Sequence, residues 1–164
     1  FDNFVVPSDA LLGTLNGGFT QLKTQLATER VILAVSAVAA MERAVDLTVE
    51  YTKDREMFGN SLFQMQNTRF ELAECATIAR VSRVFLDDAI EYLLRGALCS
   101  DTAAMAKYWL SEQQCTVIDR CLQLFGGYGY STEYPIGQMY ADARIQKIYA
   151  GANEVMKELI ARKL

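Results

Sequence analysis

Proline occurs only twice in this chain of 164 residues, at Pro7 and Pro135. Because proline removes a backbone donor and clashes with the preceding helical turn, the long stretch between the two allows helices to run without interruption. The alternation of apolar and polar residues that is typical of strands appears nowhere after residue 7. The sequence therefore predicts an all-α fold.

Apolar residues recur at steps of three and four along three long segments, which is the spacing of one helix face. The segments run from Leu26 to about Tyr51, from Ser61 onward, and from Asp101 to Gly126. At about 25 residues each, such helices would be roughly 37 Å long. Their stripes are Val31, Val35, Val38, Met41, Val45, Val49; Leu72, Cys75, Ala79, Ser82, Leu86, Ala89, Leu93; and Ala104, Tyr108, Ser111, Cys115, Ile118, Leu122.

Local signals predict where these helices begin. Ser61 and Gln64 have the spacing of a capping box, and Asp101 is a good N-cap residue. A shorter helix is expected from Pro135 to about Ile148, and another from Asn153 as its cap to the C-terminus. Near-heptad stripes on long antiparallel helices predict an up-and-down helical bundle of four to five helices, over residues 17–164.

Composition excludes several classes of function. A net charge of -4 leaves no basic surface for a nucleic acid backbone, and the absence of histidine excludes Ser-His and Cys-His nucleophile pairs and His-containing metal sites. The four cysteines lie far apart without a CxxC pair, and three fall on apolar stripes, so no metal site and a reducing compartment are expected. No uncharged apolar run of about 18 residues is present, so no membrane span is expected.

Three connections between the predicted helices differ from the short polar turns that a helical bundle needs. In "DREMFGNSLFQMQ" an Arg and a Phe precede a Gly, which on its own also fits an ordinary helix C-terminus. In "LQLFGGYGYSTEYP" three glycines lie among aromatic residues, and they fit a linker as well as a loop that binds phosphate through peptide N–H groups. In "YAGAN" small residues precede a helix start, which fits a plain turn or an opening for a ligand.

Taken together, these motifs resemble, in their residues and their order, those of the C-terminal domain of acyl-CoA dehydrogenases. These enzymes use FAD to introduce a double bond into acyl-CoA thioesters. The resemblance covers essentially the whole chain, through "FDNFVVPSDALLG", "REMFG" with "FQMQ", "QLFGGYGYSTEYP" and "DARIQKIYAGANEVMKELIARKL". "MAKYW" and "NEVMKELIARKL" look most like the long-chain branch. The opening "FDNFVVPSD" is typical of a strand end followed by a Pro turn, and the resemblance implies that residues 1–16 are the end of a middle β domain and a linker.

The resemblance also implies which residues meet FAD. Arg55, Phe58 and Gln66 would contact its adenine-diphosphate part, and Gln123, Gly126 and Gly127 would line its pyrophosphate from a neighbouring subunit. A guanidinium and free peptide N–H groups suit a pyrophosphate, and an exposed Phe can pack on adenine. Such sharing implies a homo-oligomer, a dimer or a tetramer.

At the position of the family's usual catalytic base, this chain departs from the family pattern. Much of the family has Glu where this chain has Ala150, and a methyl group cannot take a proton. The isovaleryl and long-chain branches instead place a Glu just before an Arg on the first long helix, and "LATERVILA" supplies Glu29 and Arg30 there. Glu29 is therefore the predicted base, although alone it fits a solvated acid, and Arg30 fits either a substrate contact or a surface cation.

The remaining predicted contacts surround the small residues 150–152. Tyr149 and Gly151 would contact substrate, with volume left free near its alpha and beta carbons. The family's Thr at the position of Ala152 commonly contacts flavin, and the methyl group of Ala152 cannot make that hydrogen bond. Asn153 or Glu154 would compensate, with Glu154 near the family's ribose contact.

The resemblance implies that Glu29 removes the alpha proton while hydride leaves the beta carbon for FAD, and that an electron-transferring flavoprotein accepts the electrons. A matrix or bacterial cytoplasmic location would follow. The alternative is a non-catalytic partner subunit of the same family, which would retain the bundle for assembly.

Overall fold

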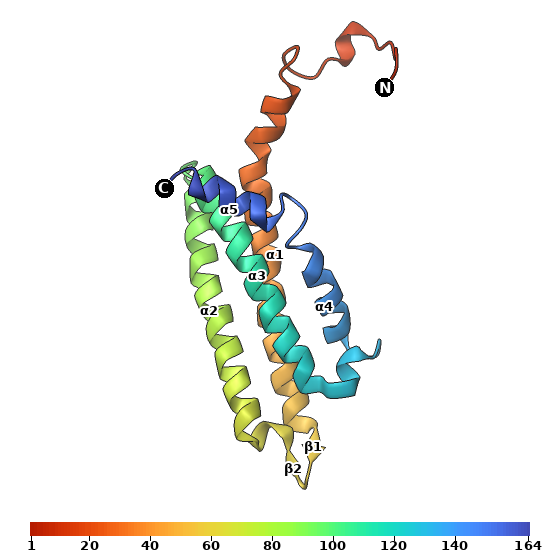
Figure 1. Ribbon diagram of the computed structural model, residues 1–164, viewed down its shortest axis with the longest axis vertical. Coiled ribbons are helices and arrows are strands. Elements are labelled where there is room, and N and C mark those ends of the chain that lie inside the picture. Colours follow the sequence, from red (N-terminus) through yellow and green to blue (C-terminus); the bar gives the residue numbers. More distant parts are fainter.

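The computed structural model describes residues 1–164 and is an all-α bundle, as predicted (Figure 1). Three long helices lie side by side: α1 (Gly18–Asp54), α2 (Gln66–Leu94) and α3 (Ser100–Phe125). Two shorter helices, α4 (Pro135–Ile145) and α5 (Asn153–Ala161), pack on α3. Short 3-10 turns, η1 (Ser8–Ala10), η2 (Leu62–Gln64) and η3 (Gly126–Tyr130), and two-residue strands β1 (Glu56–Met57) and β2 (Asn60–Ser61), complete the chain.

The core lies between α1, α2 and α3, where the predicted stripes meet. Most stripe residues are buried, but Val35 is exposed because the buried face of α1 turns through Ala34 and Ala37. Burial of this apolar area, at roughly 25 cal/mol per Å², is the main force that holds the helices together. Ion pairs at the edge of the core join neighbouring helices, Arg83 with Glu42 and Arg120 with Glu71 and Glu74.

The cysteines agree with the prediction that they pack as small apolar residues. Cys75 and Cys121 are buried in the core and Cys115 is half-buried, while Cys99 is exposed at the start of α3. All four are free thiols.

The predicted start of the second helix was wrong. Ser61 lies in β2 and its side chain caps nothing, so the expected capping box with Gln64 does not form, and α2 begins at Gln66. The segment before it pairs as a hairpin, Glu56 with Ser61 and Met57 with Asn60. Pairs this short carry no alternation, which is why the sequence pattern missed the strands.

Other helix ends moved by a few residues. Helix α1 begins at Gly18 rather than Leu26, and α4 ends at Ile145 rather than about Ile148. Helix α3 begins at Ser100 with Cys99 as its N-cap, so Asp101 lies in the first turn instead of capping it. Asn153 is likewise the first residue of α5 rather than its cap.

Residues 1–16 extend away from the bundle beyond the N-terminal end of α1 (Figure 1), with all of their side chains exposed. They contain η1 but no strand, since a strand needs a partner and this chain offers none there. The predicted assignment of this segment to a preceding β domain stays a prediction. None of the helices is both long enough and apolar enough to cross a membrane.

Candidate functional site

The residues predicted to bind ligands gather at two opposite ends of the bundle (Figure 1). One group lies where α1 ends, the hairpin turns and α3 ends, at residues 55–68 and 123–131, and we call this the hairpin end. The other lies beside the first turns of α1 within the bundle, at residues 29–30 and 146–154, and we call this the loop end. On α3, Lys107 lies at the loop end and Phe125 at the hairpin end. At a rise of 1.5 Å per residue, the distance between them along the helix axis is about 27 Å.

The hairpin is built by a tight turn at Phe58 and Gly59. Both residues have positive φ, 54° and 80°, the pattern that lets a two-residue turn match the twist of its strands. Gly59 adopts this conformation without cost, whereas Phe58 is strained. The Phe58 side chain is 89% exposed, so the turn holds an aromatic ring out in solvent.

Beside the hairpin lies a hollow of about 780 Å³ between the end of α1 and the end of α3. Arg55 is the only charged residue among those that line it, which gives the hollow a positive character. Polar side chains and open backbone surround the guanidinium. The lining residues are Tyr51, Arg55, Met57, Leu62, Met65, Asn67, Thr68, Gln123, Leu124, Phe125, Gly126, Gly127, Tyr128 and Ser131.

The glycine run serves several purposes. Gly126 has a φ of 60° and ends α3, with its N–H bonded to the Gln123 carbonyl, while space around both Gly126 and Gly127 is open on the side a Cβ would occupy. Gly129 is different, because a Cβ there would lie 2.7 Å from the Leu122 carbonyl oxygen. The sequence alone did not decide whether this glycine run is a linker or a loop that binds a ligand. Gly129 fits the packing role, and Gly126 and Gly127 present bare backbone to the hollow.

An aromatic cluster forms the wall behind this backbone. The Tyr51 ring stacks on Phe125 with centroids 4.1 Å apart, and the Tyr51 hydroxyl donates to the Phe125 carbonyl at 3.2 Å. The Arg55 guanidinium lies 5.4 Å from the centre of the Tyr128 ring, in cation–π contact. These contacts orient Arg55 without an ion pair, which leaves its charge available for a ligand.

A second hollow of about 560 Å³ shares Arg55 but has the opposite character, because Glu50, Asp54 and Glu133 line it. An anion is therefore favoured in the first hollow. Of the other predicted contacts at this end, Gln123 lines the first hollow, while Phe58 and Gln66 lie next to lining residues, are exposed, and do not line it themselves.

At the loop end, residues 147–152 form a turn with strained backbone. Ala150 has a φ of 52° and Gly151 a φ of 99°. A Cβ on Gly151 would lie 2.5 Å from the Cε of Met156, which is fully buried beneath it. The turn therefore requires Gly at 151, and it holds Ala150 in a region that L-residues rarely adopt.

The predicted base and its neighbour differ in burial. Glu29 is exposed on α1, whereas Arg30 is only 7% exposed and its Nε atom has no hydrogen-bond partner. Burial lowers the pKa of Arg30, and the Glu29 carboxylate opposes that shift. Burial of this side chain rules out the plain surface cation that the sequence left open for Arg30, and its unpartnered N–H is a rare feature in a folded chain.

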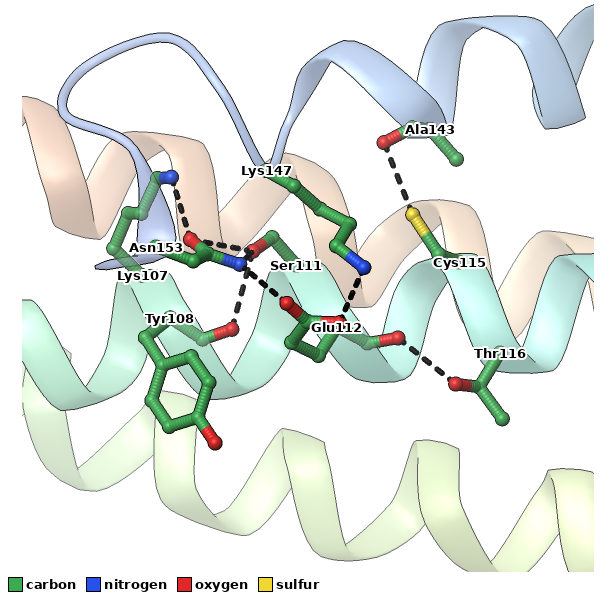
Figure 2. Close-up of polar contacts among 9 residues, drawn as sticks. All are labelled: Lys107, Tyr108, Ser111, Glu112, Cys115, Thr116, Ala143, Lys147 and Asn153. Carbon is green, nitrogen blue, oxygen red and sulfur yellow. Dashed lines mark hydrogen bonds and ion pairs between the residues drawn. The ribbon is translucent and has the colours of Figure 1, made fainter. Parts of the chain in front are cut away.

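Asn153 and Glu154, the two predicted compensating contacts, point in different directions. Glu154 is exposed, as is Tyr149 within the turn. The Asn153 side chain is 1% exposed and faces α3, where the Lys107 ammonium donates to its Oδ1 at 2.7 Å (Figure 2). Because its amide is already paired inside the chain, Asn153 acts here as an anchor of the turn, and we do not assign it a direct cofactor contact.

Sequence reasoning missed the partners of Asn153. Its Nδ2 donates to Ser111 Oγ at 3.0 Å and to Glu112 Oε1 at 2.9 Å, and the other Glu112 oxygen lies 2.5 Å from Lys147 Nζ (Figure 2). One signal was present, because Lys107 lies one turn before Ser111 on the buried face of α3, among small and apolar residues such as Ala103, Ala106 and Leu110. A lysine at such a position indicates a buried partner.

Comparison with known proteins identifies the fold and its motifs. Residues 16–164 match the family described as "Acyl-CoA dehydrogenase, C-terminal domain". The chain belongs to the acyl-CoA dehydrogenase family.

Individual acyl-CoA dehydrogenases agree with this assignment. The chain is 44% identical, over all 164 residues, to the mitochondrial long-chain specific acyl-CoA dehydrogenase of Mus musculus, and covers 38% of that relative. A crystal structure of acyl-CoA dehydrogenase from Geobacillus kaustophilus superimposes with a TM-score of 0.93 at 40% identity, over 96% of this chain and 42% of that one. Butyryl-CoA dehydrogenase from Megasphaera elsdenii gives 0.91 at 34% identity, over 96% and 41%. The chain thus spans less than half the length of the relatives it matches.

Proposed function

We propose that this chain is the C-terminal domain of an FAD-dependent acyl-CoA dehydrogenase that converts an acyl-CoA thioester to its trans-2,3-enoyl product. The observation that carries the proposal is that the predicted cofactor contacts and the predicted catalytic residues lie at opposite ends of the bundle. The hairpin end presents Arg55 and bare glycine backbone, and the loop end carries Glu29 on α1 and the turn of small residues at 150–152.

The residues of the hairpin end fit FAD. The hollow has one cation, an amide side chain at Gln123, and open backbone at Gly126 and Gly127, a donor set that matches a pyrophosphate. The exposed Phe58 ring and the apolar wall supply surface for a planar base. Glu154 and Gln66 remain proposed contacts at the edge of the cofactor.

The loop end fits the removal of a proton from the substrate. Glu29 takes the proton on the alpha carbon onto its carboxylate, while Tyr149, Gly151 and Arg30 hold the thioester. FAD, when bound, supplies the hydride acceptor for the beta carbon, so that two hydrogens leave the substrate and the double bond forms. Glu29 is exposed on α1, so its carboxylate is free to accept that proton.

The two ends serve different active sites. Because a packed bundle separates them by about 27 Å, the hairpin end of one copy completes the FAD site of a neighbour's loop end. The protein is therefore proposed to be a homo-oligomer, a dimer or a tetramer. Exposed apolar side chains on α2, among them Phe70, Val81 and Val84, offer a face for this assembly.

An electron-transferring flavoprotein is the proposed acceptor of the electrons. The relatives include mitochondrial and bacterial proteins, which supports a mitochondrial matrix or bacterial cytoplasmic location. The free thiols fit a reducing compartment.

An anaerobic titration of the complete protein with acyl-CoA thioesters tests the proposal. We expect a yellow protein whose flavin absorbance bleaches on addition of substrate, with a dependence on acyl chain length. A colourless protein would support the alternative, a non-catalytic partner subunit. A yellow protein that no acyl-CoA bleaches would contradict the proposed reaction while leaving FAD binding intact.

A further inference from the structure

Lys107 is the largest side chain that is fully buried in this chain, with 0% exposure. No carboxylate lies within ion-pair distance of its ammonium, so the cost of burying the charge is not offset by a salt bridge. The proposed reaction does not use it, and an apolar residue of similar length would fill the same space. A buried cation without a salt bridge calls for a role beyond packing.

The ammonium makes one hydrogen bond inside the chain, to the side chain of Asn153. Asn153 is the first residue of α5 and follows directly on the turn at 147–152. Its Nδ2 bonds to Ser111 and Glu112 on the same stretch of α3 that carries Lys107 (Figure 2). Lys107 therefore orients an amide whose every polar atom is held by α3.

The same cluster closes the other end of the turn. The Asn153 backbone N–H donates to the Lys147 carbonyl at 3.1 Å, and the Lys147 ammonium pairs with Glu112. The strained residues Ala150 and Gly151 lie between these two anchors. Strained backbone persists only where its surroundings determine it, and here α3 supplies that determination.

We propose that Lys107 is a positioning residue: through Asn153 it fixes the turn at 147–152 on α3, and so sets where the thioester lies relative to Glu29. This inference rests on the proposed function. The reacting atoms do not touch Lys107, and its effect is transmitted through the turn.

The charges around Lys107 are consistent with a donating ammonium. Burial, the largest cause, lowers the pKa of Lys107 to about 8; Arg30 of α1 acts in the same direction, and Glu112 of α3 and Glu154 of α5 oppose the shift. Near neutral pH the side chain is therefore mostly protonated. That Arg30 affects Lys107 also places the neighbour of the proposed base close to this cluster.

The test compares Lys107→Met with Lys157→Met in the complete flavin-loaded protein. Methionine keeps the length and packing of the stem but removes the donor. Lys157 lies on α5, exposed and 4.8 Å from the Tyr108 ring, so the control removes a nearby lysine outside the cluster. Readouts are FAD content, the rate of flavin reduction at saturating acyl-CoA, the KM, and hydrogen exchange of the amides at 148–153.

We expect the Lys107→Met protein to retain FAD, since the hairpin end is unchanged, and its turn amides to exchange faster. At saturating acyl-CoA its flavin should be reduced roughly 10- to 100-fold more slowly, with a smaller change in KM. Lys157→Met should match the parent. Ser111→Ala, which removes one anchor of Asn153 with little loss of packing, should shift exchange and rate in the same direction by less, and it serves as the test if Lys107→Met does not fold.

Unchanged exchange of the turn amides in these variants would overturn the inference, and so would faster exchange with an unchanged rate per bound FAD. A parent protein that acyl-CoA does not reduce would instead contradict the proposed function. In that case amide exchange alone still decides whether Lys107 fixes the turn.

Discussion

The two ends of the bundle differ in where their polar groups find partners. At the hairpin end, Arg55 has no ion pair and the glycine backbone faces an open hollow. At the loop end, Lys107, Asn153, Ser111, Glu112 and Lys147 bond to one another inside the chain. The contrast fits the proposed function, in which the hairpin end binds the pyrophosphate of FAD and the buried cluster of the loop end fixes the turn at 147–152.

The largest effect that separates the two ends should come from Glu29→Gln. The amide keeps the shape of the side chain but cannot take a proton, so FAD should still bind while flavin reduction by acyl-CoA falls by about 10²- to 10⁴-fold. Stopped-flow absorbance measures the rate. Glu91→Gln, at an exposed position on α2, is the matched control and should match the parent. Reduction of Glu29→Gln at the parent's rate would remove the base from the loop end.

At the hairpin end we expect a smaller effect, on FAD binding and not on the rate of flavin reduction. Arg55→Met removes the one cation of the hollow, so FAD should dissociate roughly 10- to 100-fold more readily, because hydrogen bonds to charged groups are worth about 1.5–3 kcal/mol. Flavin that remains bound should be reduced at the parent's rate. Arg69→Met removes an exposed cation on α2 that does not line the hollow. Equal weakening of FAD binding by both variants would indicate a general charge effect in place of a specific contact.

The buried cluster of the loop end should also appear in the pH dependence of stability. The pKa of Lys107 is lowered to about 8 in the folded chain and is about 10.4 when unfolded, so between these values the unfolded state binds more protons. Stability contributed by this group therefore rises with pH through that window. Relative to Lys107→Met, the parent should gain roughly 1–3 kcal/mol in free energy of unfolding between pH 7 and pH 10, measured by urea titration. A constant difference would show that the pKa of Lys107 is the same in the folded and the unfolded chain, so that burial does not lower it.

The smallest effect concerns the turn itself. Ala150 has a φ of 52° and Ala152 a φ of -54°, so glycine relieves strain at the first position and only adds freedom to the unfolded chain at the second. Ala150→Gly should therefore be more stable than Ala152→Gly by about 1 kcal/mol in thermal unfolding. The opposite order would mean that the turn is not held in the left-handed conformation.

The sequence predicted the parts of the molecule that depend on hydrophobic periodicity and on local sequence motifs. Stripes such as Val38, Met41 and Val45 identified the core because burial repeats with the helix, and the glycine run located the end of α3. The hairpin at 56–61 was missed because two-residue strands have no period, and the role of Asn153 because its partners are 41 to 46 residues away in the chain. Contacts of that kind depend on how α3 and α5 pack, which no local pattern encodes.

The central claim is that each active site takes its hairpin end and its loop end from different copies of the chain. The most direct test coexpresses Glu29→Gln chains and Arg55→Met chains with different affinity tags and isolates the mixed oligomer, at FAD concentrations that saturate only the parent. In a mixed pair, one site carries both substitutions and the other carries neither. We therefore expect the mixed oligomer to recover about half of the parent's flavin reduction by acyl-CoA. A mixed oligomer no more active than either variant alone would contradict it.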